Sequence, residues 1–322
     1  MAERVLLKYP IKNYQLKFIQ HGENATFKVS TAKSNFLLRL HRDSYHSKEA
    51  ILEELELLNW LSNNSVLEVQ KPLSSKFKKY VELGEGERMP SRFCSILHWR
   101  DGRSKYKSLS SGHFESVGEL TSNLHKSTKG FKLNHRNYWD TQGLIGLEST
   151  MGSFRSIESS ISKKQYEILS DCRKMVFSKL MNYQKKYPEK MNVVHGDLHF
   201  GNLLWSQNKV TPIDFDDCGY GFELMDLAVT LNASSNILKN VGKTEAKRIT
   251  DSLLNGYSKS MSLSDFDLEI LPYFILARDL VLFAWLHGRR TNPKLAIHFK
   301  KSVARMIKTF NNSISQGPQN IF

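Results

Sequence analysis

Two short motifs carry side chains suited to phosphoryl transfer. The first is HGD at residues 195–197, whose Asp197 is followed five residues later by Asn202. Phosphoryl transfer needs a carboxylate that orients the attacking hydroxyl and accepts its proton, with an oxygen ligand for Mg²⁺ close by. The second motif is IDF at residues 213–215, whose Asp214 follows Asn202 by twelve residues. Since Mg²⁺ takes one or two protein oxygen ligands together with phosphate oxygens, Asn202 and Asp214 fit a magnesium site.

These motifs belong to a strand-rich island within a mainly helical stretch. The apolar runs NLLW (202–205) and VTPID (210–214) flank the polar turn SQNK (206–209), which predicts two short strands joined by a turn. Each strand ends beside acidic residues, where short loops can present catalytic groups from a rigid base. Apolar periodicity predicts helices around the island at residues 116–125, 163–187, 224–238, 243–261 and 267–288.

A β-rich region precedes the helices. The runs YQLKFI, TFKV and NFLLRL, between residues 14 and 40, predict an antiparallel meander because the segments between them have turn chemistry. Apolar residues at three- and four-residue steps predict a helix over residues 48–61, and SRFCSILHW at 91–99 predicts a buried strand. We therefore expect a small antiparallel β lobe over residues 1–98 and a larger, mainly helical lobe over residues 99–322.

With these motifs the chain resembles the aminoglycoside phosphotransferase, choline kinase and homoserine kinase-like family, which shares a protein-kinase-like fold. The resemblance rests on HGDLHFGNLLW and IDFDDCGYGFELMDLA, and extends through GENATFKV, LLRLHR and EELELLNWL. It implies a bilobed α+β fold, Asp197 as catalytic base, Asn202 and Asp214 as magnesium ligands, and Asp226 as a buried brace for the HGD loop. We expect His195 to hydrogen-bond the backbone of that loop, because imidazole is a poor ligand for Mg²⁺.

Arg39 is the candidate phosphate-binding residue of the β lobe. Strand alternation places it on the face opposite Leu38 and Leu40, so its side chain can point into a cleft. Members of the family carry Lys or Arg here to hold the nucleotide phosphates, and arginine does so with a bidentate fork. Its expected partner is Glu54, which has apolar helical neighbours three, four and seven residues away. Glu53 is the alternative, on a solvated face.

The nucleotide is expected to contact two further segments. The turn QHGENA has one glycine, so its backbone amides would bind phosphate with less freedom than a glycine-rich loop. The adenine would lie against the segment that leaves the last strand of the β lobe, where Trp99 fits ordinary packing equally well. The residues concerned are Gly22, Glu23 and Asn24 in the turn, and Leu97, His98, Trp99 and Arg100 in the second segment.

Two further carboxylates follow the metal motif. Asp216 and Asp217 could bind a cationic acceptor or brace Arg and His side chains. We favour bracing, because carboxylates next to a metal site often orient its ligands.

Composition limits the remaining possibilities. A net charge of +14 would attract an anionic ligand, but the basic stretch 100–107 lacks regular aromatic interleaving, so we expect only non-specific binding of nucleic acid. Three scattered cysteines and the absence of an N-terminal apolar run favour the cytoplasm. Pro272 and two charged residues interrupt the most apolar segment, 271–287, which predicts a buried helix and no membrane span.

The combined prediction is a bilobed phosphotransferase with ATP and Mg²⁺ bound between its lobes. It would move the γ-phosphoryl group to a hydroxyl of a small molecule, namely an amino-alcohol, a sugar or an antibiotic. A protein Ser/Thr kinase of the same superfamily is the alternative enzyme. A catalytically silent nucleotide-binding module is the alternative from another class, although the intact Asp197, Asn202 and Asp214 oppose it.

Overall fold

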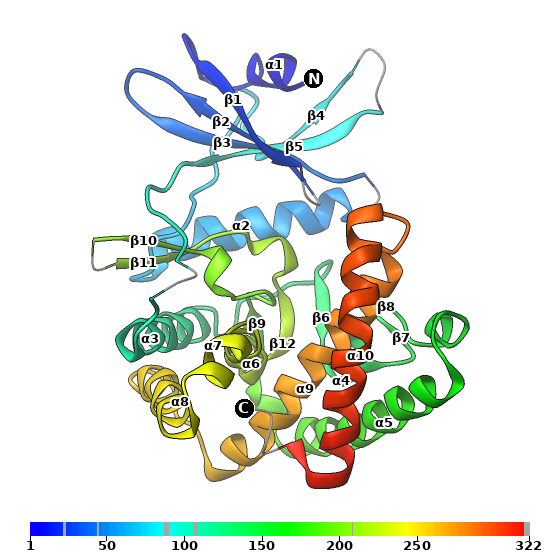
Figure 1. Ribbon diagram of the computed structural model, residues 1–322. Helices are drawn as coiled ribbons and strands as arrows, with labels where there is room; N and C mark the ends of the chain where they lie inside the picture. Colours follow the sequence, from blue (N-terminus) through cyan, green and yellow to red (C-terminus); the bar gives the residue numbers. More distant parts are fainter. Residues whose placement is uncertain (22–23, 44, 87–89, 106–107, 208, 319–322) are drawn as a thin grey trace. The chain divides into compact units, whose positions relative to one another are not determined.

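The computed structural model describes residues 1–322 except 22–23, 44, 87–89, 106–107, 208 and 319–322 (Figure 1). The chain forms two compact units. Unit 1 comprises Met1–Ser104, Phe131–Arg136 and Asn202–Asp216, and unit 2 comprises Lys105–Gly130, Asn137–Gly201 and Asp217–Phe322. The predicted lobe boundary after residue 98 stays a prediction.

Unit 1 is built on a five-stranded antiparallel sheet with the strand order β1-β2-β3-β5-β4. The first three strands form the meander expected from the sequence, and β4 is an edge strand that the sequence did not reveal. The bounds are Gln15–His21 for β1, Ala25–Ser30 for β2, Asn35–Leu40 for β3, Val81–Gly84 for β4 and Arg92–His98 for β5.

Alternation along β3 sends its side chains to two different partners. Leu38 and Leu40 point to the face covered by the short helix α1 (Ala2–Leu6), where Val5 and Leu6 join the same buried cluster (Figure 1). Arg39 points the other way and contacts α2 (Lys48–Asn64). The Ser47 hydroxyl caps α2 by accepting a hydrogen bond from the Ala50 N–H.

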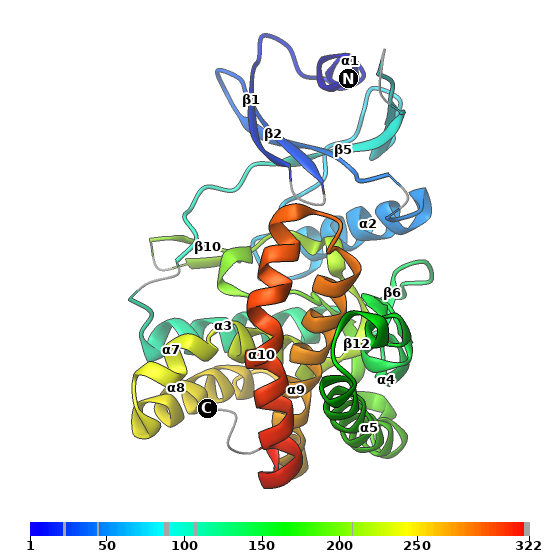
Figure 2. The same cartoon turned by 45° about the vertical axis from the view of Figure 1, so that its right-hand side comes forward.

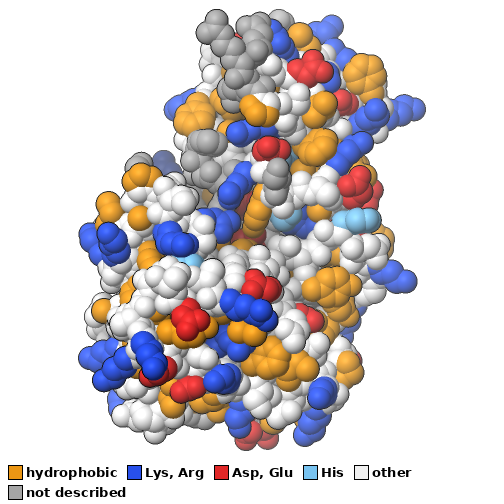
Figure 3. Space-filling model, turned by 90° about the vertical axis from the view of Figure 1, so that its right-hand side faces the viewer, with side chains coloured by type: hydrophobic (Ala, Val, Ile, Leu, Met, Phe, Trp, Pro, Cys, Tyr) orange, Lys and Arg blue, Asp and Glu red, His pale blue; other side chains and the backbone are white. Residues whose placement is uncertain are grey.

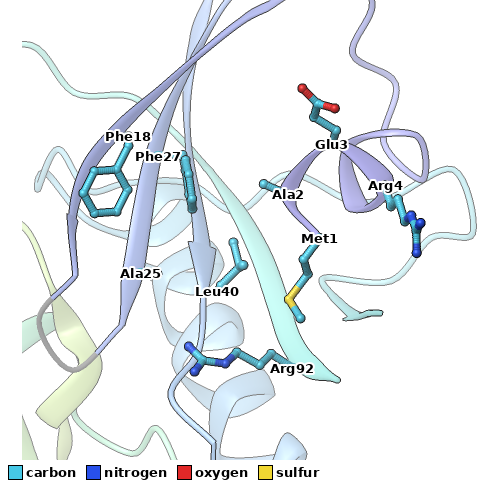
Figure 4. A pocket seen from close by; sticks show the side chains of 9 residues that line it. All are labelled: Met1, Ala2, Glu3, Arg4, Phe18, Ala25, Phe27, Leu40 and Arg92. Carbon is cyan, nitrogen blue, oxygen red and sulfur yellow. The ribbon is translucent and has the colours of Figure 1, made fainter. Parts of the chain in front are cut away.

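A mainly apolar cavity lies on the α1 face of the sheet. It has a volume of about 550 Å³ and opens between α1 and the first strands (Figure 4). None of the site residues expected from the sequence lines it. The lining consists of Met1, Ala2, Glu3, Arg4, Phe18, Ala25, Phe27, Leu40 and Arg92.

Two later segments of the chain complete unit 1. The strands β10 (Leu203–Ser206) and β11 (Lys209–Pro212) form the antiparallel hairpin that NLLW and VTPID predict. Trp205 of this hairpin exchanges backbone hydrogen bonds with Arg103. The hairpin therefore leaves Asn202 at its start and Asp214 just after its end.

Unit 2 is mainly helical. Its longer helices are α3 (Ser111–Ser127), α5 (Lys163–Lys186), α8 (Lys243–Ser258), α9 (Asp265–Gly288) and α10 (Pro293–Gln316), and its shorter ones are α4 (Thr141–Ile145), α6 (Glu223–Ala233) and α7 (Ser235–Asn240). The single helix expected over residues 224–238 is wrong, because the chain turns at Ser234 between α6 and α7. The helix α10 was not predicted.

Small strands hold the functional loops of unit 2. The strand β12 (Gly219–Phe222) runs parallel to β6 (Asn137–Trp139) and antiparallel to β9 (Met191–Val194). A two-stranded hairpin, β7 (Glu148–Ser149) with β8 (Gly152–Ser153), lies elsewhere in the unit. The HGD loop begins directly after β9.

Two glycines allow α3 and α8 to pack closely, side by side in Figures 1 and 2. A Cβ on Gly118 of α3 would lie 2.0 Å from the Leu253 carbonyl oxygen, and a Cβ on Gly256 of α8 would lie 2.0 Å from the Glu115 carbonyl oxygen. Any larger residue would push the helix backbones apart.

The helix α9 is long and apolar enough to cross a membrane. However, 67% of its most apolar window is buried inside the protein. It packs against α5, α6 and α10, which is the position of a core helix. The sequence-based prediction of a buried helix is therefore confirmed.

Candidate active site

The HGD loop of unit 2 is held by a carboxylate from α6. Asp226 accepts hydrogen bonds from the backbone N–H of His195 (2.8 Å, to Oδ2) and of Gly196 (2.9 Å, to Oδ1). Gly196 has φ +80°, and a Cβ there would lie 2.4 Å from the Asp217 carbonyl oxygen. The role of Asp226 as a brace stays a prediction, and these are the two bonds that would carry it.

His125 of α3 extends this support and was missed by sequence reasoning. Its Nε2 lies 3.1 Å from Asp226 Oδ2, and its Nδ1 lies 2.9 Å from the Tyr257 hydroxyl of α8. Burial alone would raise the pKa of Asp226, but its hydrogen bond with His125 and the nearby histidine charges hold it below its ordinary value. A single histidine on an amphipathic helix gives no local signal of such a role.

Asp197 is paired with two side chains of unit 2. Arg278 of α9 donates from Nη2 to Asp197 Oδ1 at 2.5 Å, and His199 Nε2 lies 3.3 Å from Oδ2. Burial alone would raise the pKa of Asp197, but the Arg278 guanidinium and His199 hold it well below its ordinary range. Sequence reasoning missed Arg278 as a site residue, although a charge inside the apolar run 271–287 was the available signal.

Arg39 lies within a carboxylate cluster of unit 1. Its Nη1 is 2.7 Å from Glu54 Oε1, its Nη2 is 3.2 Å from Asp214 Oδ1, and Asp216 Oδ1 is 3.7 Å from Nη1. Burial lowers the pKa of Arg39, but the three carboxylates more than offset this and raise it above its ordinary value. The partner of Arg39 is thus Glu54. The expectation that Glu53 lies on a solvated face is wrong, because its carboxylate accepts hydrogen bonds from backbone N–H groups of the segment Phe131–Arg136.

The two candidate magnesium ligands lie at the two ends of the β10–β11 hairpin of unit 1. The Ile213 N–H donates to the Asn202 carbonyl oxygen at 2.9 Å, which links the two ends of the hairpin. Asp214 has φ +62°, and its side chain is 47% exposed. Among the described residues, no three His, Cys, Asp or Glu side chains are grouped to hold a metal. An amide and a half-exposed carboxylate nevertheless fit Mg²⁺, which takes few protein ligands when it also binds phosphate.

Asp216 and Asp217 lie in different units. The Asp216 carbonyl oxygen accepts hydrogen bonds from His46 Nε2 (2.9 Å) and from the Arg136 guanidinium, and its carboxylate faces Arg39. The Asp217 carbonyl oxygen accepts a hydrogen bond from Trp139 Nε1 at 2.8 Å. The surroundings of Asp216 are those of a residue that braces Arg and His side chains, and its acceptor-binding alternative has no contact in its support.

Several residues of the two segments expected to contact the nucleotide already form hydrogen bonds with other residues of unit 1. Gly22 and Glu23 lie outside the described residues, and Asn24 Oδ1 accepts the Arg42 N–H at 2.9 Å. In the second segment, Leu97 is fully buried, and three N–H groups of the next residues, two of the backbone and one of a side chain, already have partners. These are His98 N–H to the Lys71 carbonyl, Trp99 N–H to the Asn35 carbonyl, and Arg100 Nε to the Val69 carbonyl. The Trp99 ring is covered by Lys28 Nζ, 4.6 Å from its centroid.

The match to a protein family identifies the enzyme class. A model described as "Phosphotransferase enzyme family" matches residues 15–258. The chain belongs to this family. Amicoumacin kinase of Bacillus subtilis (strain 168) is 24% identical in an alignment 304 residues long that covers 87% of this chain and 82% of that protein.

Solved structures share the fold over nearly the whole chain. A microcompartment-associated aminopropanol kinase has a TM-score of 0.84 at 24% identity, covering 100% of this chain and 99% of that one. The amicoumacin kinase hAmiN, solved with AMP-PNP, Ca²⁺ and Ami, has a TM-score of 0.80 at 21% identity, covering 97% and 92%. The predicted α+β, protein-kinase-like fold is confirmed, and so is the enzyme class of a phosphotransferase.

Proposed function

We propose that the chain transfers the γ-phosphoryl group of ATP, bound with Mg²⁺, to a hydroxyl of a small amino-alcohol. The contacts of Arg39 with Glu54 (2.7 Å) and Asp214 (3.2 Å) carry this proposal. A buried guanidinium beside a half-exposed carboxylate supports a nucleotide site, because the cation can pair with phosphate oxygens while the carboxylate binds the metal. The amino-alcohol named for one relative supports this acceptor class over a sugar or an antibiotic.

Each residue has a separate role in this proposal. The planar fork of Arg39 would bind the nucleotide phosphates, and Glu54 would hold the guanidinium in place. Asn202 and Asp214 would hold Mg²⁺, which neutralises phosphate charge when bound. Asp197 would accept a hydrogen bond from the acceptor hydroxyl. The hydroxyl oxygen bonds to the γ-phosphorus, the bond to the ADP oxygen breaks, and the hydroxyl proton passes to Asp197.

The low pKa of Asp197 determines how it would contribute. A carboxylate held ionised by Arg278 has little affinity for a proton at neutral pH. It would therefore act mainly by orienting the hydroxyl, and would take the proton late, when the oxygen has become acidic by bonding to phosphorus.

We also infer a cytoplasmic protein with small-molecule partners. The three cysteines are free and buried, which supports a reducing compartment. Lys and Arg side chains are scattered over the face shown in Figure 3 rather than gathered in one patch. On this face, the distribution supports weak, non-specific binding of nucleic acid at most.

The test combines an acceptor screen with two variants. ADP release is measured with amino-alcohol, sugar and protein acceptors, and the thermal shift caused by Mg²⁺ and ATP is measured for Asp197→Asn and Asp214→Asn. Asp197→Asn should keep most of the shift and lose roughly 10²- to 10⁴-fold in turnover. Asp214→Asn should lose most of the shift together with turnover, because the nucleotide stabilises only by occupying its site.

The matched control is Asp251→Asn on α8, whose carboxylate forms an exposed pair with Lys247. It should leave both measurements unchanged. Near-normal turnover of Asp197→Asn, or a full Mg²⁺-dependent shift in Asp214→Asn, would show that the roles are wrong. Phosphorylation of the protein acceptor alone would replace the small-molecule proposal with the protein kinase alternative.

A further inference from the structure

Arg278 stands out in the most apolar helix of the chain. It lies in the middle of α9, whose neighbouring residues Ala277 and Leu280 are fully buried, and it is itself only 9% exposed. A charged side chain in such surroundings costs several kcal/mol unless it is paired. Its place among buried apolar residues therefore points to a function rather than to packing.

The Arg278 guanidinium is only partly used within the protein. It carries five N–H groups in a planar fork, and one nitrogen, Nη2, bonds to Asp197 Oδ1. Throughout the part of the chain that the structure describes, its other N–H groups have no hydrogen-bond partner, while 11% of the side chain is exposed. The fork therefore has donors left for a molecule that binds beside Asp197.

We infer that Arg278 binds a carboxylate of the acceptor, so that the proposed amino-alcohol substrate also carries a carboxylate, which makes it a hydroxy amino acid. This inference rests on the proposed function, in which Asp197 accepts the acceptor hydroxyl. The 2.5 Å contact and an ordinary O–H···O distance of about 2.7 Å bring that hydroxyl within about 5 Å of Nη2. A carboxylate one or two carbons from the hydroxyl is then within reach of the fork.

The charges around Asp197 favour this acceptor over a cationic one. An ammonium group at the same place would face the guanidinium, whereas a carboxylate can form the bidentate pair that arginine geometry matches.

The simpler reading is that Arg278 only positions Asp197. In that case a carboxylate on the acceptor would bring no gain, and loss of Arg278 would lower turnover equally for every acceptor. The two readings therefore differ in the split between KM and kcat.

The experiment compares acceptors that differ by one carboxylate. The pairs are L-threonine with 1-amino-2-propanol, and L-serine with ethanolamine. Binding is measured by calorimetry and ADP release by a coupled assay, for the wild type, Arg278→Gln and Arg278→Lys. The control is Arg248→Gln on α8, where an exposed arginine pairs with Glu245.

We expect the wild type to bind a carboxylate-bearing member about 10- to 100-fold more tightly, the value of a charge-assisted hydrogen bond. Arg278→Gln should raise the KM of the carboxylate-bearing member, so that the two members of each pair bind with similar affinity. Arg278→Lys should keep part of the difference in affinity. Arg248→Gln should behave as the wild type does.

Three results would decide against the inference. They are equal binding within both pairs by the wild type, tighter binding of the amino-alcohols, or an equal loss of kcat for both members in Arg278→Gln. The first two of these results are measured on the wild type alone, so they do not depend on whether the variants fold. If the carboxylate preference is present and depends on Arg278, but no acceptor is phosphorylated, the inference stands and the proposed phosphoryl transfer fails.

Discussion

The buried pair of Arg39 and Glu54 allows a structural role to be separated from a nucleotide-binding role. Arg39 is 2% exposed and Glu54 0% exposed, and their contact is 2.7 Å long. The second carboxylate oxygen of Glu54, Oε2, has no hydrogen-bond partner among the described residues. Replacing Arg39 with alanine therefore leaves a buried carboxylate without compensation.

The expected loss of stability is large. Removing one partner of a buried ion pair costs about 3–5 kcal/mol. At about 2–4 °C per kcal/mol for a chain of this size class, the melting temperature of Arg39→Ala should fall by roughly 6–20 °C. Arg39→Lys keeps the charge and should lose less. The double variant Arg39→Leu with Glu54→Leu removes both charges and should recover part of the stability, because the buried Asp216 carboxylate still loses the Arg39 charge.

Nucleotide affinity should not recover in the double variant. Loss of a charge-assisted phosphate contact costs about 1.5–3 kcal/mol, which is roughly 10- to 100-fold in Kd. Melting temperature and calorimetric ATP affinity are measured for all three variants, with the exposed Lys33→Ala of unit 1 as control. If Arg39→Ala has the same melting temperature as the wild type, the argument from the buried pair is refuted. A double variant with unchanged ATP affinity would refute the phosphate contact.

Two further predictions concern stability. Gly256→Ala should destabilise the protein by about 1–3 kcal/mol in urea unfolding, because its Cβ would lie 2.0 Å from the Glu115 carbonyl oxygen, whereas Gly112→Ala in α3, with its nearest contact at 3.8 Å, should be close to neutral; equal effects would contradict the packing argument. Burial and the Arg39 charge lower the pKa of His41 to about 3. Below about pH 6.5 the unfolded chain therefore binds a proton that the folded protein does not, and the free energy of unfolding decreases as the pH is lowered. Between about pH 7 and pH 5.5 the wild type should lose about 1 kcal/mol more than His41→Gln, and identical pH profiles of the two proteins would show that His41 does not titrate on unfolding.

Local spacing was enough to select much of the candidate site. The five-residue step from Asp197 to Asn202 and the twelve-residue step to Asp214 lie within one stretch of chain, so their chemistry can be read without a fold. The two-residue period of a strand placed Arg39 on the face opposite Leu38, and the helical period selected Glu54. The strand and helix periods are short-range regularities of the backbone, so they can be recognised from the order of polar and apolar residues alone.

The partners of those residues depended on contacts between distant segments. Arg278 is 81 residues from Asp197, His125 is 101 residues from Asp226, and Arg136 is 80 residues from the Asp216 carbonyl that it binds. No periodicity connects such positions, because only the packing of helices and strands brings them together. The sequence by itself thus determined the family, the reaction class and the residues proposed for the chemistry. The tertiary structure decided which charges surround them, and hence that Asp197 meets the guanidinium of Arg278.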